Sequence, residues 1–363
     1  MAGKVKTAAK TKSAKTKKIA VVLFNLGGPD SKNAIRPFLM NFFMDKNIVR
    51  LPLLFRFLLA SFIAARRSKR EAGESYGELG NKSPLLDNTK EQALALEKAL
   101  NTLKNTKFKT FIAMRYWHPL SAQTVRQVRD WGADELMILP LYPQFSTTTT
   151  GSSLEEWNKA AFEADYECPS SMVCCYPENA GFIKAAADNI AMQYDKAKED
   201  KFKNIRVLFS AHGLPESIIK AGDPYQWQCE QTAEKIVKAL GVKDLDWQIC
   251  YQSRVGAQKW IGPSLDEALD KAAEDGKAVV VFPHAFTQEH VETLVELDIE
   301  YRHEAQKKGV PGYYRAAAVS THPDFIEGLA KLVKSHIKKR QIAAEGGKII
   351  CPKEFGDCCM RRV

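Results

Sequence analysis

Four glutamates repeat at helical spacing in residues 286–301, whose sequence is FTQEHVETLVELDIEY; they are Glu289, Glu292, Glu296 and Glu300. On an α-helix with roughly 100° between residues, the four side chains fall within an arc of about 80°. Like charges three or four residues apart repel by roughly 0.2–0.5 kcal/mol per pair. The stripe indicates either a solvated acidic face or a path for a cation or for protons. The strand-like run AVVVF just upstream favours the path, because ligands bind beside strand ends in α/β sheets.

A single histidine, His212, follows another strand-like run in the segment SAHGLP. Gly213 and Pro215 predict a tight turn that would hold the imidazole at the edge of a sheet. Such a histidine is either structural or functional. As a functional group it suits proton acceptance near neutral pH or ligation of a divalent transition metal. The sequence contains neither G-x-S-x-G nor HExxH, which argues against a serine hydrolase and a zinc protease.

Strand-like and helical segments alternate along the chain and would place these residues at strand ends. Short β-branched runs predict strands at 18–24, 109–114, 135–141, 205–210, 247–251, 278–282 and 314–319. Segments between them predict helices near 87–104, 121–131, 180–200, 226–240, 264–275 and 324–339. The alternation predicts an α/β fold of two Rossmann-like lobes, with parallel sheets flanked by helices. We expect the ligand cleft between the lobes.

Composition and charge indicate an intracellular globular protein. The net charge is +10 over 363 residues, but seven lysines in residues 1–18 leave only +3 for the rest. We predict a disordered Lys-rich tail at 1–18, lobes at 19–174 and 175–329, and a C-terminal helix with a Cys-containing tail at 330–363. No secretory signal is visible, so a cytoplasmic location is expected. No nucleic-acid partner is expected, and a monomer and a homodimer are both open.

An apolar stretch at residues 51–65, LPLLFRFLLASFIAA, is followed by the basic run that contains Arg66, Arg67, Lys69 and Arg70. It is shorter than the roughly 20 residues that a spanning helix needs, and Arg56 interrupts it. An apolar face with a basic flank can lie in a membrane interface. It can equally be a buried helix whose terminal cations suit the helix dipole.

Long motifs along the chain closely resemble the ferrochelatase family. They are LFNLGGP, RYWHP, LYPQFSTTTTGSS, GDPY, YQSRVGAQKWIGP and AFTQEHVETLVELDIEY, in this order between residue 19 and about residue 340. The resemblance implies a chelatase-like fold and insertion of ferrous iron (Fe2+) into protoporphyrin IX, which gives protoheme and ends heme synthesis. It implies that His212 is the proton acceptor or metal donor and that Glu292 is its acidic partner. Glu289, Glu296 and Glu300 would continue an acidic path.

The resemblance also assigns the residues that hold the porphyrin. Leu26, Tyr142, Trp260 and Phe286 would line an apolar slot, with Gln252 and Ser253 as further pocket residues. Arg115 and Tyr116 would lie at the mouth, where a guanidinium suits a propionate carboxylate. Residues 47–70 would form a hydrophobic lip and imply peripheral contact with the inner membrane.

Some members of this family carry a [2Fe–2S] cluster on three cysteines of a terminal tail and one internal cysteine. Here the tail offers Cys351, Cys358 and Cys359, and Cys174 is the internal ligand that we assign, with Cys168 and Cys175 as alternatives. The adjacent pair 358–359 departs from the usual spacing. Two other functions stay open: a chelatase for another metal or tetrapyrrole, such as coproporphyrin or sirohydrochlorin, and a non-catalytic two-lobed carrier of metal or heme.

Overall fold

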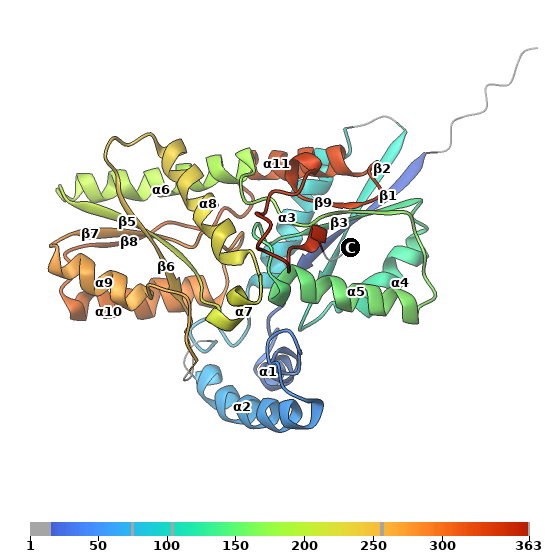
Figure 1. The fold of residues 1–363 in the computed structure, drawn as a ribbon, viewed down its shortest axis with the longest axis horizontal. Coiled ribbons are helices and arrows are strands. Elements are labelled where there is room, and N and C mark those ends of the chain that lie inside the picture. Colours follow the sequence, from blue (N-terminus) through green and yellow to red (C-terminus); the bar gives the residue numbers. More distant parts are fainter. Residues whose placement is uncertain (1–15, 74–75, 103–104, 255–257, 362–363) are drawn as a thin grey trace, which may run out of the picture.

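The computed structural model describes residues 16–73, 76–102, 105–254 and 258–361, and two parallel sheets carry these segments (Figure 1). The first sheet has the strand order β2-β1-β3-β4-β9, with β1 (Lys17–Asn25), β2 (Thr106–Met114), β3 (Glu135–Pro140), β4 (Ser170–Val173) and β9 (Ile342–Ala343). The second has the order β6-β5-β7-β8, with β5 (Ile205–His212), β6 (Asp246–Gln252), β7 (Ala278–Phe282) and β8 (Tyr313–Arg315). The predicted α/β class with parallel sheets is confirmed.

Strands β1 and β7 are buried on both faces, so helices must cover each side of both sheets. The helices are α1 (Ile35–Phe43), α2 (Leu53–Gly73), α3 (Leu85–Leu100), α4 (Ser121–Trp131), α5 (Ser152–Glu163), α6 (Ala180–Glu199), α7 (Glu216–Lys220), α8 (Tyr225–Leu240), α9 (Leu265–Glu274), α10 (Tyr301–Lys308) and α11 (Pro323–His336). Two π-helical segments, η2 (Thr147–Gly151) and η3 (Glu292–Glu300), complete the elements near the site.

One hydrophobic core joins the two sheets. Val21 of β1 and Val280 of β7 belong to the same buried cluster, together with residues of α3, α6 and α11. Helices α4 and α5 cover the other face of the first sheet, and α9 with α10 covers the other face of the second. The lobes therefore pack against each other through shared apolar contacts. The boundary between residues 174 and 175 follows β4 directly and stays a prediction.

The C-terminal segment returns to the first sheet. Strand β9 pairs in parallel with β4, Met172 opposite Ile342. The predicted tail at 330–363 is therefore tied to the first lobe by backbone hydrogen bonds and brings its cysteines back to that lobe.

The first strand begins earlier than expected. Strand β1 starts at Lys17, one residue before the strand predicted at 18–24, and Lys17 and Lys18 both lie within the tail predicted for residues 1–18. Lys17 pairs with β2, and its ammonium group lies 2.5 Å from the carboxylate of Glu135, which explains its ordered position. Residues 1–15 of that predicted tail lie outside the described residues.

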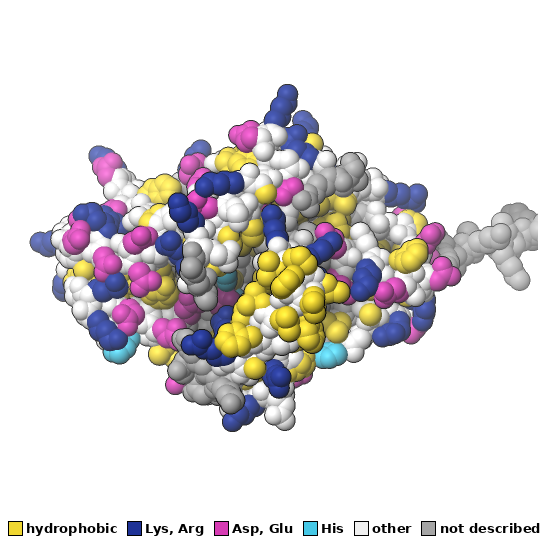
Figure 2. All heavy atoms as spheres, turned by 60° about the horizontal axis from the view of Figure 1, so that its bottom comes forward, with side chains coloured by type: hydrophobic (Ala, Val, Ile, Leu, Met, Phe, Trp, Pro, Cys, Tyr) yellow, Lys and Arg dark blue, Asp and Glu magenta, His cyan; other side chains and the backbone are white. Residues whose placement is uncertain are grey.

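Helices α1 and α2 project from the sheets as a separate layer (Figure 1). Six apolar side chains of α2, which we call the lip patch, are between 49% and 66% exposed: Leu53, Leu54, Phe55, Phe57, Leu58 and Phe62. Figure 2 shows a contiguous hydrophobic surface on this side of the molecule. Within the described part of the chain, no helix has both the length and the apolar character that crossing a membrane requires.

The acidic helix begins later than the sequence predicted. Instead of an α-helix over residues 286–301, the structure has the π-helix η3 from Glu292 onward. The preceding residues form other hydrogen bonds: Gln288 contacts Asn25 and Gln92, and the His290 backbone N–H donates to Thr293. These long-range and side-chain contacts replace the helical bonds that residues 286–291 would otherwise form.

Candidate active site

His212 is the last residue of β5 and lies opposite Gln252 of β6. Its Nδ1 is 2.8 Å from the carbonyl oxygen of Gly213. Because a carbonyl can only accept a hydrogen bond, Nδ1 carries the proton in the neutral ring and Nε2 has a free lone pair. The hydroxyl of Tyr225 donates to the His212 carbonyl over 3.1 Å and fixes the backbone at this strand end.

Glu292 faces the unprotonated nitrogen of this ring. Its Oε1 lies 3.9 Å from Nε2 of His212, and both side chains are partly exposed, 25% and 35%. The backbone N–H of Glu292 donates to Nδ1 of His290 over 3.0 Å, so the start of η3 is held by a neighbouring ring. Burial lowers the pKa of His290, which keeps that ring a neutral acceptor. The arrangement brings together the base and the acid that the sequence assigned.

Glu296 follows on the same side of η3 and is anchored to the end of β6. Its carboxylate accepts hydrogen bonds from the backbone N–H and hydroxyl of Ser253, over 3.0 and 2.6 Å, and from the Gln252 amide over 3.2 Å. Burial, and then repulsion from Glu292, raises the pKa of Glu296 to about 7. A carboxyl group with this pKa exchanges protons near neutral pH.

The other two glutamates of the predicted stripe are placed differently. Glu289 precedes η3, and its carboxylate accepts from the guanidinium of Arg315 and from the backbone N–H of Ala318, each over 2.9 Å. The expectation that Glu289 shares a helical face with the others is wrong, since the helix starts after it. Glu300 is the last residue of η3 and is exposed.

Leu26 and Phe286 pack against residues next to Glu292, the acidic partner of His212. Leu26, just after β1, packs against the same apolar cluster of α1 and α2 as Val291, the residue before Glu292. Phe286 contacts the ring of His290 edge to face, with the centroids 4.6 Å apart. Apolar side chains from both lobes therefore meet beside the start of η3.

Trp260 and Tyr142 occupy two further positions. Trp260 forms a β-bridge with Pro215, three residues beyond His212, and is partly exposed. Tyr142 follows β3 and packs against the cluster between the first sheet and helices α4 and α5. Its burial raises the pKa of the phenol above the usual value.

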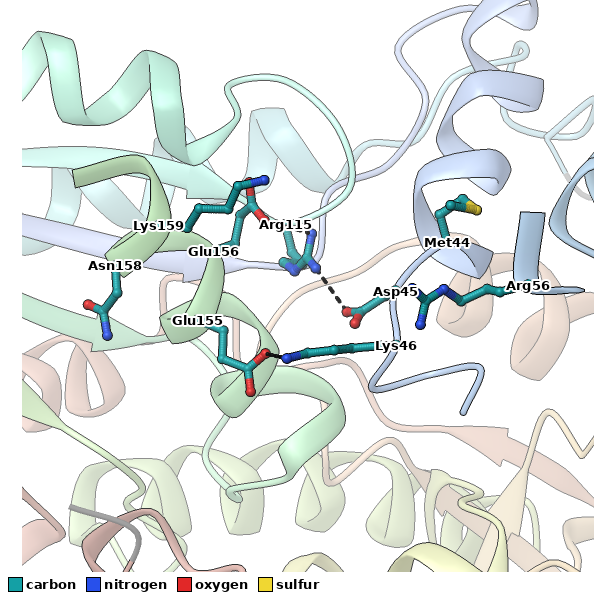
Figure 3. Close-up of a pocket in the computed structure, with 9 residues that line it drawn as sticks. All are labelled: Met44, Asp45, Lys46, Arg56, Arg115, Glu155, Glu156, Asn158 and Lys159. Atoms are coloured by element: carbon teal, nitrogen blue, oxygen red, sulfur yellow. Dashed lines mark hydrogen bonds and ion pairs between the residues drawn. The ribbon is translucent and has the colours of Figure 1, made fainter. Parts of the chain in front are cut away.

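Arg115 and Tyr116, the two residues predicted at the mouth, both contact the carboxylate of Asp45. Asp45 was not among the predicted site residues. Tyr116 is fully buried, so its expected position at a mouth is wrong; its hydroxyl donates to Asp45 over 2.7 Å. Arg115 lies 3.1 Å from the same carboxylate (Figure 3). It also donates to the hydroxyl of Ser152 over 2.6 Å. Asp45 directly follows the apolar run Phe42-Phe43-Met44, which was an available signal.

Five buried cysteines gather where the C-terminal tail meets the end of β4: Cys174, Cys175, Cys351, Cys358 and Cys359. The sulfur atoms of Cys174 and Cys175 are 3.3 Å apart. The Gln228 amide donates to Cys351 over 3.2 Å and to Cys175 over 3.5 Å. A hydrogen bond with Cys351 lowers the pKa of Cys358 to about 6.

Two parallel sheets and a strand-end histidine that faces carboxylates define the α/β fold of this protein. The structure of SirB from Bacillus subtilis with Fe3+ has this fold, with a TM-score of 0.50 at 14% identity over 89% of this chain and 96% of that one. The family model for ferrochelatase matches residues 18–337, and the chain belongs to the ferrochelatase family.

Curated relatives are similar over almost their full length. Ferrochelatase of Caulobacter vibrioides strain NA1000 is 50% identical over 325 residues, 89% of this chain and 92% of the relative. Ferrochelatase of the Wolbachia strain wRi is 51% identical over 315 residues, 87% of this chain and 98% of the relative. The protein is therefore an enzyme, a porphyrin metal chelatase.

Proposed function

We propose that the protein inserts ferrous iron into protoporphyrin IX and releases two protons, the terminal step of heme synthesis. The observation that carries this proposal is the contact between Nδ1 of His212 and the Gly213 carbonyl oxygen. This contact holds Nδ1, so the basic Nε2 points toward Glu292. Two N–H protons must leave the porphyrin before its four nitrogens bind the metal, and an unprotonated imidazole is suited to take them one at a time.

In this mechanism His212 accepts a pyrrole proton at Nε2, and Glu292 stabilises the imidazolium that forms. The 3.9 Å separation between the two groups allows the charge pair to shorten when the ring becomes cationic. Glu296, with a pKa near 7, takes the proton onward along η3. Glu300 at the exposed end returns it to water. Fe2+, as the second substrate, would meet the same carboxylates if it enters along this route.

The porphyrin would lie beside the start of η3, against Leu26, Phe286 and Trp260. Its apolar ring needs such a surface with few polar anchors. Tyr142 belongs to this wall by resemblance, and Gln252 and Ser253 contribute by fixing Glu296. Arg115 is the propionate ligand in this proposal, and it must exchange its contact with Asp45 for the substrate carboxylate.

Anaerobic turnover with Fe2+ and a panel of porphyrins tests the function by absorbance. Protoporphyrin IX should give protoheme faster than coproporphyrin or sirohydrochlorin gives its metal complex. Preference for either of the latter would assign the protein to another chelatase activity. Tight binding of heme without faster formation of heme would identify a carrier.

We also propose a [2Fe–2S] cluster on Cys351, Cys358, Cys359 and an internal cysteine. The donor set fits: thiolates are the ligands of such clusters, and the tail sulfurs are buried next to β4. Among the residues that the structure describes, no three sulfur atoms lie within 4.8 Å of one another, so the group does not match a single-ion site. Cys174 is our assigned internal ligand, and Cys175 shares the Gln228 donor with Cys351.

When bound, the cluster would supply a one-electron centre and a link between the tail and the first lobe. Iron and acid-labile sulfide analysis of anaerobically purified protein tests it, together with the visible spectrum. Colourless protein without sulfide would refute the cluster.

A third proposal is peripheral contact with the cytoplasmic face of the inner membrane through the lip patch. Support comes from the six exposed apolar side chains of α2 and from the basic run that follows them in the sequence. An apolar face with a cationic flank binds at the headgroup boundary of anionic bilayers. Co-sedimentation with vesicles tests this proposal, and protein that stays in the supernatant at every lipid concentration would contradict it.

A further inference from the structure

A pocket of about 510 Å³ lies beside the lip patch and shares Arg115 and Asp45 with the site described above. Figure 3 shows its lining: the end of α1, the side chain of Arg56 from α2, and one face of α5. It holds four cations and three acids, namely Lys46, Arg56, Arg115 and Lys159 with Asp45, Glu155 and Glu156. The lining therefore carries a small surplus of formal positive charge.

Arg56 provides that surplus. Lys46 is 3.1 Å from Glu155, and Arg115 is 3.1 Å from Asp45. Among the described residues, Arg56 has no acidic partner within salt-bridge distance, and its Nε is enclosed without a hydrogen-bond acceptor. An enclosed donor without a partner is unfavourable, and a guanidinium presents several donors in one plane. An oxyanion bound in the pocket would therefore give the guanidinium of Arg56 the acceptor that it lacks.

The position of Arg56 indicates where that oxyanion comes from. Its neighbours Phe55 and Phe57 are 61% and 49% exposed, so the guanidinium turns into the pocket between side chains that face outward. Phe55 and Phe57, on either side of Arg56 in α2, both belong to the lip patch. A ligand that satisfies both groups has an anionic head joined to apolar chains.

We propose that this pocket binds the phosphate group of an anionic phospholipid, with Arg56 as the principal ligand. The inference rests on the proposed membrane contact and adds a specific headgroup site to it. The acyl chains would lie over the lip patch, and the phosphate would reach the guanidinium at the edge of the helix. Free phosphate offers the same oxyanion, but it leaves the apolar neighbours exposed.

The test measures binding of the full chain to vesicles of phosphatidylglycerol and of phosphatidylcholine. Arg56→Gln should weaken binding to phosphatidylglycerol about tenfold or more, as loss of a hydrogen bond to a charged group does. The matched control is Arg36→Gln, because Arg36 is an exposed arginine of the adjacent helix α1. Loss of one ordinary surface charge near an anionic bilayer should weaken binding by about fivefold at most.

Equal losses in the two variants would overturn the site and leave only general charge attraction. Binding of millimolar inorganic phosphate to lipid-free wild-type protein, together with unchanged binding of Arg56→Gln to phosphatidylglycerol, would also overturn it by assigning the pocket to free phosphate. The double variant Leu54→Glu/Phe62→Glu separates the headgroup site from the membrane contact through the lip patch. If this double variant binds vesicles as wild type does, the proposed membrane contact is wrong.

Discussion

Glutamine in place of Glu296 should change the stability of the protein in a way that depends on pH. The pKa of Glu296 is raised from 4.5 to about 7 in the folded protein, so the folded state binds this proton more tightly than the unfolded state does. Its contribution to stability is complete below pH 4.5 and is lost as the pH rises through 7. Between pH 5 and pH 8 the loss comes to about 2.5 kcal/mol, at about 1.36 kcal/mol per pKa unit.

Glu296→Gln has no proton to lose, so relative to wild type it should gain about 2.5 kcal/mol of unfolding free energy on going from pH 5 to pH 8. The substitution also disturbs the hydrogen bonds to Ser253 and Gln252, but that loss is the same at both pH values and cancels in the comparison. Urea unfolding followed by tryptophan fluorescence measures the difference.

The control for this experiment is Glu300→Gln, which changes an exposed glutamate at the other end of η3. The reasoning is refuted if Glu296→Gln differs from wild type by the same amount at pH 5 and pH 8. Turnover of Glu296→Gln should nevertheless fall, because the variant lacks the carboxylate that accepts the proton from His212 in the proposed mechanism.

Three further outcomes are expected. His212→Ala should lower kcat for iron insertion at least about 100-fold, the range of general-base catalysis, with an unchanged unfolding midpoint; normal turnover would remove His212 from the mechanism. Cys358→Ser should abolish the visible absorption and the sulfide content of anaerobically purified protein, whereas retention of both would exclude Cys358 as a ligand. Tyr116→Phe removes a buried hydrogen bond and should cost about 1–3 kcal/mol of stability in urea unfolding, and an unchanged midpoint would show that Asp45 is satisfied without it.

The sequence predicted the fold class from local signals, and the family resemblance supplied the pairing of His212 with Glu292. Buried β-branched runs alternate with helices, and parallel strands bring their ends to one edge of a sheet. His212 ends its strand, and η3 follows another strand of the same sheet. Family resemblance then supplied the chemical roles, which the spacing alone left open.

Features that depend on contacts between residues far apart in the sequence were not predicted. The late start of η3 reflects the bond between Asn25 and Gln288, which are 263 residues apart. The burial of Tyr116 depends on Asp45, 71 residues earlier. Helical periodicity carries no information about such partners, so it extended the helix to Glu289. The family resemblance, which placed Tyr116 at the mouth, did not include its contact with Asp45.

The pairing of β9 with β4 has a consequence for biosynthesis. While the ribosome is still short of residue 343, the nascent chain can form the other four strands of the first sheet, but β4 is left with an open hydrogen-bonding edge. Such an edge can pair with another copy, so products that stop before this point should be the ones that aggregate. A chaperone that shields the growing chain would therefore be needed longest at β4.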